Sequence, residues 1–127
     1  MKTIAAFSNG EGGTLLIGVN NAQEAVGLEY DYSSLDGGRD EFEIHLRNLI
    51  NSNFDINFAK SNLGITFHSV DDKDVCKIEI KRGNEPKHME LKSNSGAITE
   101  KFYVRSGNSS PEMPVSDAAA YIQSRFG

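Results

Sequence analysis

Residues 4–19 read IAAFSNGEGGTLLIGV, and this stretch decides the fold. It opens with the helix formers 4–7 and breaks at Ser8-Asn9-Gly10, where asparagine and glycine tolerate the left-handed conformation that closes a helix. After two glycines, the apolar run 14–19 has the length of a strand. A strand that is apolar at successive positions is typically buried on both faces, so we expect this one to be central in its sheet.

The glycines of this turn do not predict a phosphate-binding loop. Such a loop runs from a strand into a helix, so that the helix N-terminus meets the phosphates. Here the helix comes first, and no Gly-Lys-Ser or Gly-Lys-Thr follows. We interpret the glycines as residues of a tight turn.

Length and composition predict one globular domain spanning residues 1–127, with 38% hydrophobic residues to form its core. There is no run of about 18 apolar residues that could span a bilayer, so we expect no membrane contact. The N-terminus does not read as a signal peptide, and the single Cys76 cannot form an internal disulfide. Both observations favour the cytoplasm.

The net charge of −5 is unevenly spread along the chain. Residues 1–72 carry 4 basic and 11 acidic side chains, whereas residues 73–105 carry 8 basic and 5 acidic ones. A nucleic-acid binder normally presents a basic face, and only the second segment offers one. Lysines on a solvated strand face give the same pattern without any ligand.

Hydrophobic periodicity predicts the remaining elements. Amphipathic helices are expected at 39–51 and at 117–126, the second with Ser116 as N-cap and with Ala120, Tyr121 and Phe126 facing inward. The expected strands and loops are a hairpin formed by 14–19 and 25–29, a loop at 30–38, a second hairpin around the acidic turn 71–74, an edge strand at 86–91 and a strand at 100–105. This order predicts an α+β fold whose sheet is mixed and mostly antiparallel, with helices packed on it.

Two polar features of the sequence have residue types that can bind ions. The carboxylates of the turn 71–74 lack the spacing of a calcium loop, so we interpret them as turn formers. The polar loop 106–111 follows a strand that ends in Arg105 and can cradle an anion, although such loops usually need no ligand. Cys76 falls on the inward phase of its strand and is expected to be a core residue.

The pattern resembles the Schlafen/AlbA-like nucleic-acid-binding domain of bacterial proteins. Its signature, A-F-x-N-x-x-G-G-x-L-x-I-G-V followed by V-G and F-Y-V-R-x-G-N-S-S, appears at 6–19, at 26–27 and at 102–110. Segments 38–43 and 73–76 are also similar to those of bacterial members. The resemblance covers nearly the whole chain.

What the resemblance implies about catalysis is negative for this chain. Ribonuclease-active relatives use two glutamates in an E-x-x-x-x-E segment and an aspartate after the G-V of the core strand, which suits metal-assisted phosphodiester cleavage. The glutamate segment would lie upstream of Met1, and Asn21 occupies the aspartate position. We therefore expect no catalytic residue, no metal and no cofactor.

The favoured hypothesis is a non-catalytic DNA- or RNA-binding, or regulatory, domain. Cations would contact phosphates, and one aromatic ring would stack on a base. The expected nucleic-acid-binding residues are Lys81, Arg82, Lys87, Lys92, Lys101, Tyr103, Arg105 and Asn108.

Two alternatives come from other classes. Because the family's upstream strand is absent, the sheet is expected to have an open edge, which invites pairing into a homodimer. The chain would then be an interaction module. The other alternative is a fragment of a metal-dependent nuclease or of an ATP-binding protein, although the chain has neither the acidic triad nor a Walker motif.

Overall fold

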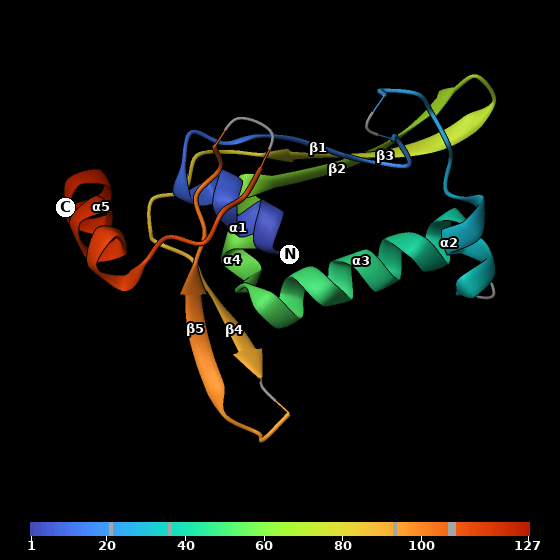
Figure 1. Ribbon diagram of the computed structural model, residues 1–127. Helices are drawn as coiled ribbons and strands as arrows, with labels where there is room; N and C mark the ends of the chain where they lie inside the picture. The colour runs from blue at the N-terminus through green and yellow to red at the C-terminus, as the bar shows by residue number, and fades with distance from the viewer. Residues whose placement is uncertain (21, 36, 93, 107–108) are drawn as a thin grey trace. The chain divides into compact units, whose positions relative to one another are not determined.

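The computed structural model describes residues 1–20, 22–35, 37–92, 94–106 and 109–127 (Figure 1). Its elements in chain order are α1 (Lys2–Asn9), β1 (Gly13–Ile17), α2 (Glu29–Ser34), α3 (Arg39–Asn53), α4 (Ile56–Asn62), β2 (Leu63–Val70), β3 (Lys73–Ile80), β4 (His88–Lys92), β5 (Ile98–Phe102) and α5 (Val115–Phe126). The expected α+β class is confirmed.

Residue contacts divide the chain into two compact units. Unit 1 comprises Met1–Gly13 and Ile80–Gly127, and unit 2 comprises Thr14–Glu79. None of the helices in the described part of the chain is both long enough and apolar enough to cross a membrane.

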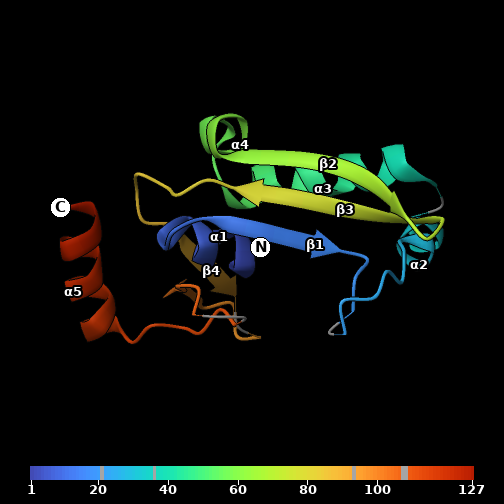
Figure 2. The same ribbon diagram turned by 90° about the horizontal axis from the view of Figure 1, so that it is seen from above.

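Unit 2 contains most of a three-stranded sheet in the order β1-β3-β2, and α3 runs along one face of it (Figure 2). Neighbouring strands in this sheet run in opposite directions. Cys76 and Ile78 of the central strand are fully buried, as is Ile50 of α3. The predicted helix at 39–51 and the hairpin formed by β2 and β3 are both confirmed.

The acidic turn between β2 and β3 has a conformational explanation. Asp71 and Asp72 both have positive φ, at 52° and 62°. A two-residue hairpin loop of this kind matches the twist of the strands, and aspartate tolerates the left-handed region better than most residues. The interpretation as turn formers is therefore confirmed for Asp71 and Asp72, whereas Asp74 lies in β3 and was wrongly included.

The prediction that the first strand is central was wrong. Among the described residues β1 lies at an edge of its sheet, and β3 is the central strand. Leu16 of β1 is 47% exposed, whereas β3 alternates buried residues with Lys77 and Glu79. An uninterrupted apolar run therefore did not distinguish an edge strand from a central one.

The predictions for residues 20–38 and 54–62 also need correction. Instead of a hairpin, the structure has a single antiparallel bridge between Val19 and Ala25. The expected loop at 30–38 begins as the helix α2, because Leu28 and Tyr32, four residues apart, are both buried. The unpredicted α4 has Asp55 as its N-cap, and the Asp55 carboxylate accepts a hydrogen bond from the Phe58 N–H at 2.7 Å.

Unit 1 contains α1, the hairpin of β4 and β5, and α5 (Figure 1). The two strands pair antiparallel, with Met89 opposite Lys101. Both strands and the last helix were expected, but α5 begins directly after Pro114, so Ser116 lies within the helix and is not its N-cap. Its buried residue is Ala118, and Ala120 is exposed.

The turn after α1 uses a different glycine from the one expected. Gly10 follows the helix with φ −99°, outside the left-handed region, whereas Gly12 has φ +81°. The Gly12 N–H donates to the Phe7 carbonyl at 2.8 Å. The left-handed residue therefore comes two positions later than the Asn-Gly pair indicated.

Candidate nucleic-acid interface

Asn9, the last residue of α1, organises unit 1. Its side chain is completely buried, and its amide nitrogen donates to the carbonyls of Lys87 and Tyr103, each at 2.9 Å. Its amide oxygen accepts from the Lys87 N–H at 2.8 Å. The hydroxyl of Tyr121 donates to the Asn9 carbonyl at 2.7 Å. One side chain thus holds α1, the segment before β4 and the segment after β5 in place.

Arg105 is fixed against α1. Its backbone N–H donates to the Ala6 carbonyl at 3.2 Å, and its guanidinium lies 4.8 Å from the centroid of the Phe7 ring. A guanidinium nitrogen also donates to Ser110 Oγ at 3.0 Å. A Cβ at Gly13 would lie only 2.3 Å from the Phe7 ring, so glycine is needed there to leave room for the ring. The contact with the Phe7 ring holds the charged guanidinium of Arg105 against α1.

Three further cations contact the same region. Arg125 donates to the carbonyls of Gly10 and Gly83, at 3.0 and 2.9 Å. Arg82 forms an ion pair of 3.6 Å with the exposed carboxylate of Glu11. On α1 itself, the Lys2 ammonium lies 5.5 Å from the centroid of the Tyr103 ring. We call Lys2, Arg82, Arg105 and Arg125 the α1 cationic cluster.

The sequence identified only half of this cluster. Arg82 and Arg105 were predicted, but Lys2 and Arg125 lie outside the basic segment 73–105 and were missed. Nothing in the local pattern of either residue indicates its position. They meet the others because Asn9 and the turn at Gly10 receive contacts from α5.

The other predicted cations are placed less favourably for contact with phosphates. Lys101 is bound to Glu112 at 2.9 Å, and this hydrogen bond raises the pKa of its ammonium group. The side chain of Lys87 is only 16% exposed and lies 3.9 Å from Glu85. Lys81 is exposed directly after β3. For Lys92 the structure gives a backbone position in β4, opposite Ile98.

The two remaining predicted residues are an aromatic and an amide. Tyr103 is 9% exposed, and its ring carries the Lys2 ammonium, so it does not offer an open face for stacking on a base. Asn108 lies outside the described residues, and so does Asn21, the residue that the sequence resemblance sets at the aspartate position. Among the described residues, no group of three His, Cys, Asp or Glu side chains is arranged to hold a metal ion.

The charge of the chain follows its division into units. Unit 1 carries eight lysines and arginines against six carboxylates, a balance of +2. Unit 2 carries five against twelve, a balance of −7. Every predicted nucleic-acid-binding residue that the structure describes belongs to unit 1. Unit 1 is therefore positively charged, although the net charge of the whole chain is negative.

Unit 2 has a polar contact of its own. The Tyr32 hydroxyl donates to Asp74 at 2.6 Å, and Arg39 lies 3.8 Å from the other oxygen of that carboxylate. Burial, followed by the hydrogen bond to Asp74, raises the pKa of Tyr32 to about 12. The hydroxyl therefore stays protonated at neutral pH, as a donor that links α2 to β3.

Comparison with known proteins places the chain in a family. The model of the Schlafen, AlbA_2 family matches residues 1–114, which include all of unit 2 and all of unit 1 that precedes α5. The chain belongs to this Schlafen, AlbA_2 family, and the resemblance found in the sequence is confirmed. Membership supports a nucleic-acid-related function. No solved structure matches the chain.

Proposed function

We propose that the protein binds DNA or RNA through unit 1, without cleaving it, and that the α1 cationic cluster and Lys81 contact phosphates. The observation that carries the proposal is the separation of charge: unit 1 is positive in a chain with a net charge of −5. Phosphate contacts by lysine and arginine supply most of the affinity in sequence-independent binding. The acidic unit 2 contributes repulsion and so restricts binding to one unit.

Two features support binding without cleavage in the cytoplasm. Asn21 is a neutral amide where nuclease relatives have an aspartate, and an amide cannot supply the missing negative charge at a metal. The single Cys76 is buried as a free thiol, which is compatible with a reducing compartment.

The decisive variant changes two adjacent exposed cations, Lys81→Gln with Arg82→Gln. We expect it to weaken binding of labelled single-stranded RNA and of duplex DNA by about tenfold, since two phosphate contacts are lost. Fluorescence anisotropy at fixed low salt measures the change. Circular dichroism verifies that the variant remains folded.

The matched control is Arg47→Gln with Lys60→Gln, which removes the same charge from unit 2. We expect this control to bind as tightly as the unaltered chain or more tightly. Equal weakening by both double variants would show that only net charge matters. An unchanged affinity of the Lys81 and Arg82 variant would also contradict the proposed contacts.

A homodimer is a second candidate, favoured by one observation. Among the described residues β1 forms a sheet edge and exposes Leu16, and unpaired edges can pair with another chain. Light scattering would then give twice the mass of the chain, and Leu16→Lys would reduce it to a monomer. A monomer at all concentrations would exclude this candidate.

A further inference from the structure

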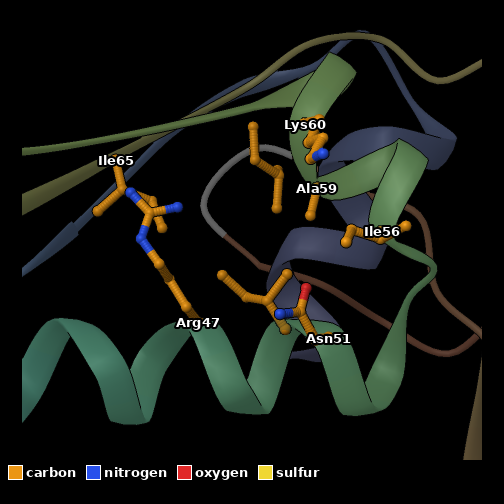
Figure 3. A pocket seen from close by; sticks show the side chains of 8 residues that line it. Arg47, Asn51, Ile56, Ala59, Lys60 and Ile65 are labelled. Carbon is orange, nitrogen blue, oxygen red and sulfur yellow. The ribbon is translucent and has the colours of Figure 1, made fainter.

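A pocket in unit 2 lies outside everything assigned to nucleic acid. It has a volume of about 300 Å³ and lies between α3, α4 and the start of β2 (Figure 3). This is the lower end of the size range of small-molecule sites. The residues that line it are Arg47, Ile50, Asn51, Ile56, Ala59, Lys60, Leu63 and Ile65.

The interior of this pocket is aliphatic. Ile50 forms part of the buried core at 2% exposure, and Leu63 and Ile65 come from β2. Ile56 of α4 is 59% exposed, so the pocket opens to solvent with an apolar side chain at its mouth. None of the lining residues is aromatic, which disfavours a nucleobase because bases are typically held by stacking.

Two of the three polar side chains of the pocket are cations, and the third is a neutral amide. Arg47 and Asn51 extend from α3, and Lys60 extends from α4 (Figure 3). The lining includes no carboxylate, although unit 2 as a whole has a balance of −7. The pocket therefore has positively charged side chains around an apolar interior, in a unit that is negatively charged overall. Folding does not require this arrangement, since an exposed lysine can be placed anywhere on the surface.

The two cations are available to different degrees. Arg47 uses its Nε atom to bind Glu43 at 2.8 Å, which orients the guanidinium and leaves its two terminal nitrogens as donors. Lys60 has no hydrogen-bond or ion-pair partner within the part of the chain that the structure describes. A guanidinium with a nearby ammonium suits a carboxylate, which accepts hydrogen bonds through both oxygens.

We infer that this pocket binds a small aliphatic carboxylate, with its chain among Ile50, Ile56 and Leu63 and its carboxylate between Arg47 and Lys60. The volume excludes a folded partner, and the aliphatic lining selects a hydrocarbon chain over a sugar or a base. The inference does not depend on nucleic-acid binding, because the pocket and the α1 cationic cluster belong to different units.

The test is a titration of the full chain with octanoate, followed by the amide resonances in two-dimensional NMR. We expect saturable shifts at the pocket residues, with Asn51 and Ala59 among them. Octan-1-ol has the same chain without the charge and is expected to bind at least about tenfold more weakly, since it forms no charged hydrogen bonds. Equal binding of octanol, or the absence of saturable shifts at millimolar octanoate, would overturn the inference.

Variants separate this site from non-specific binding. Lys60→Gln should raise the Kd for octanoate about tenfold, whereas Lys73→Gln, an exposed lysine of the same unit outside the pocket lining, should leave it unchanged. Ala59→Leu places extra carbon atoms in the pocket and should abolish binding. If the Lys60 and Lys73 variants weaken binding equally, or if the Ala59 variant still binds, the site is not this pocket.

Discussion

At the scale of the residue, the asparagine in the family signature has a structural role. Asn9 is buried and satisfies three backbone groups with one side chain. These three hydrogen bonds need a side chain that has both donors and an acceptor. No other side chain with both has the length of asparagine. The signature residue therefore positions the basic segments of unit 1.

We expect Asn9→Ala to lower the free energy of unfolding by about 3 kcal/mol, because it leaves buried backbone groups of Lys87 and Tyr103 unpaired. Urea denaturation measures the change. The control Asn57→Ala alters an exposed asparagine and should change stability by less than about 0.5 kcal/mol. Equal stability of the two variants would contradict the role assigned to Asn9.

Tyr32 gives a pH-dependent prediction. Its folded-state pKa of about 12 lies above the ordinary value of 10.0, so the folded chain holds this proton more tightly than the unfolded chain. Its contribution to stability is complete below about pH 10 and is lost between about pH 10 and 12. The stability difference between the unaltered chain and Tyr32→Phe, measured by urea denaturation, should shrink from pH 8 to pH 11. A difference that stays constant would contradict the assigned contact with Asp74.

At the scale of the element, the turn from α1 to β1 depends on one left-handed glycine. A Cβ at Gly12 would lie 2.5 Å from the Ile80 carbonyl oxygen and 2.9 Å from the Arg82 nitrogen. The chain therefore passes close to the backbone that leads into Arg82. The double glycine is explained by close approach and by conformation, as the sequence indicated, and needs no phosphate.

We expect Gly12→Ala to destabilise the chain by about 3 kcal/mol, since a clash adds to the strain of a positive φ. Gly96→Ala is the matched control, because Gly96 has φ +87° with no atom within 4 Å of the added Cβ. It should cost only about 1 kcal/mol. Thermal denaturation followed by circular dichroism measures both. Equal losses would show that the contact with Ile80 and Arg82 does not matter.

Elements with a clear period were predictable, and those defined by tertiary contacts were not. The spacing of Phe42, Leu46 and Ile50 gave α3, and alternation gave the hairpin around Cys76, whose burial raises its thiol pKa to about 11. The short helices α2 and α4 have only one buried residue each, Tyr32 and Phe58, so no period could show them. The candidate interface was half predictable, because Arg125 reaches Gly10 from the far end of the sequence.

At the scale of the whole molecule, the boundaries between the two compact units also separate the positively charged part of the chain from the negatively charged part. The boundaries at Gly13 and Glu79 separate a unit with a balance of +2 from one with −7. Chain order obscures this division, because unit 1 is built from the two ends of the sequence. On our proposal, the basic unit 1 contacts a polyanion although the total charge of the chain is acidic.

The measurement that tests this account most directly is the affinity of the unaltered chain for labelled RNA and DNA as salt is raised. With four or five phosphate contacts, the account predicts that log Kobs falls linearly with log salt concentration, with a slope of about −3 for single-stranded RNA and about −4 for duplex DNA. Undetectable binding at low salt, or binding that does not change with salt, would contradict the assignment of unit 1 as a phosphate-binding surface.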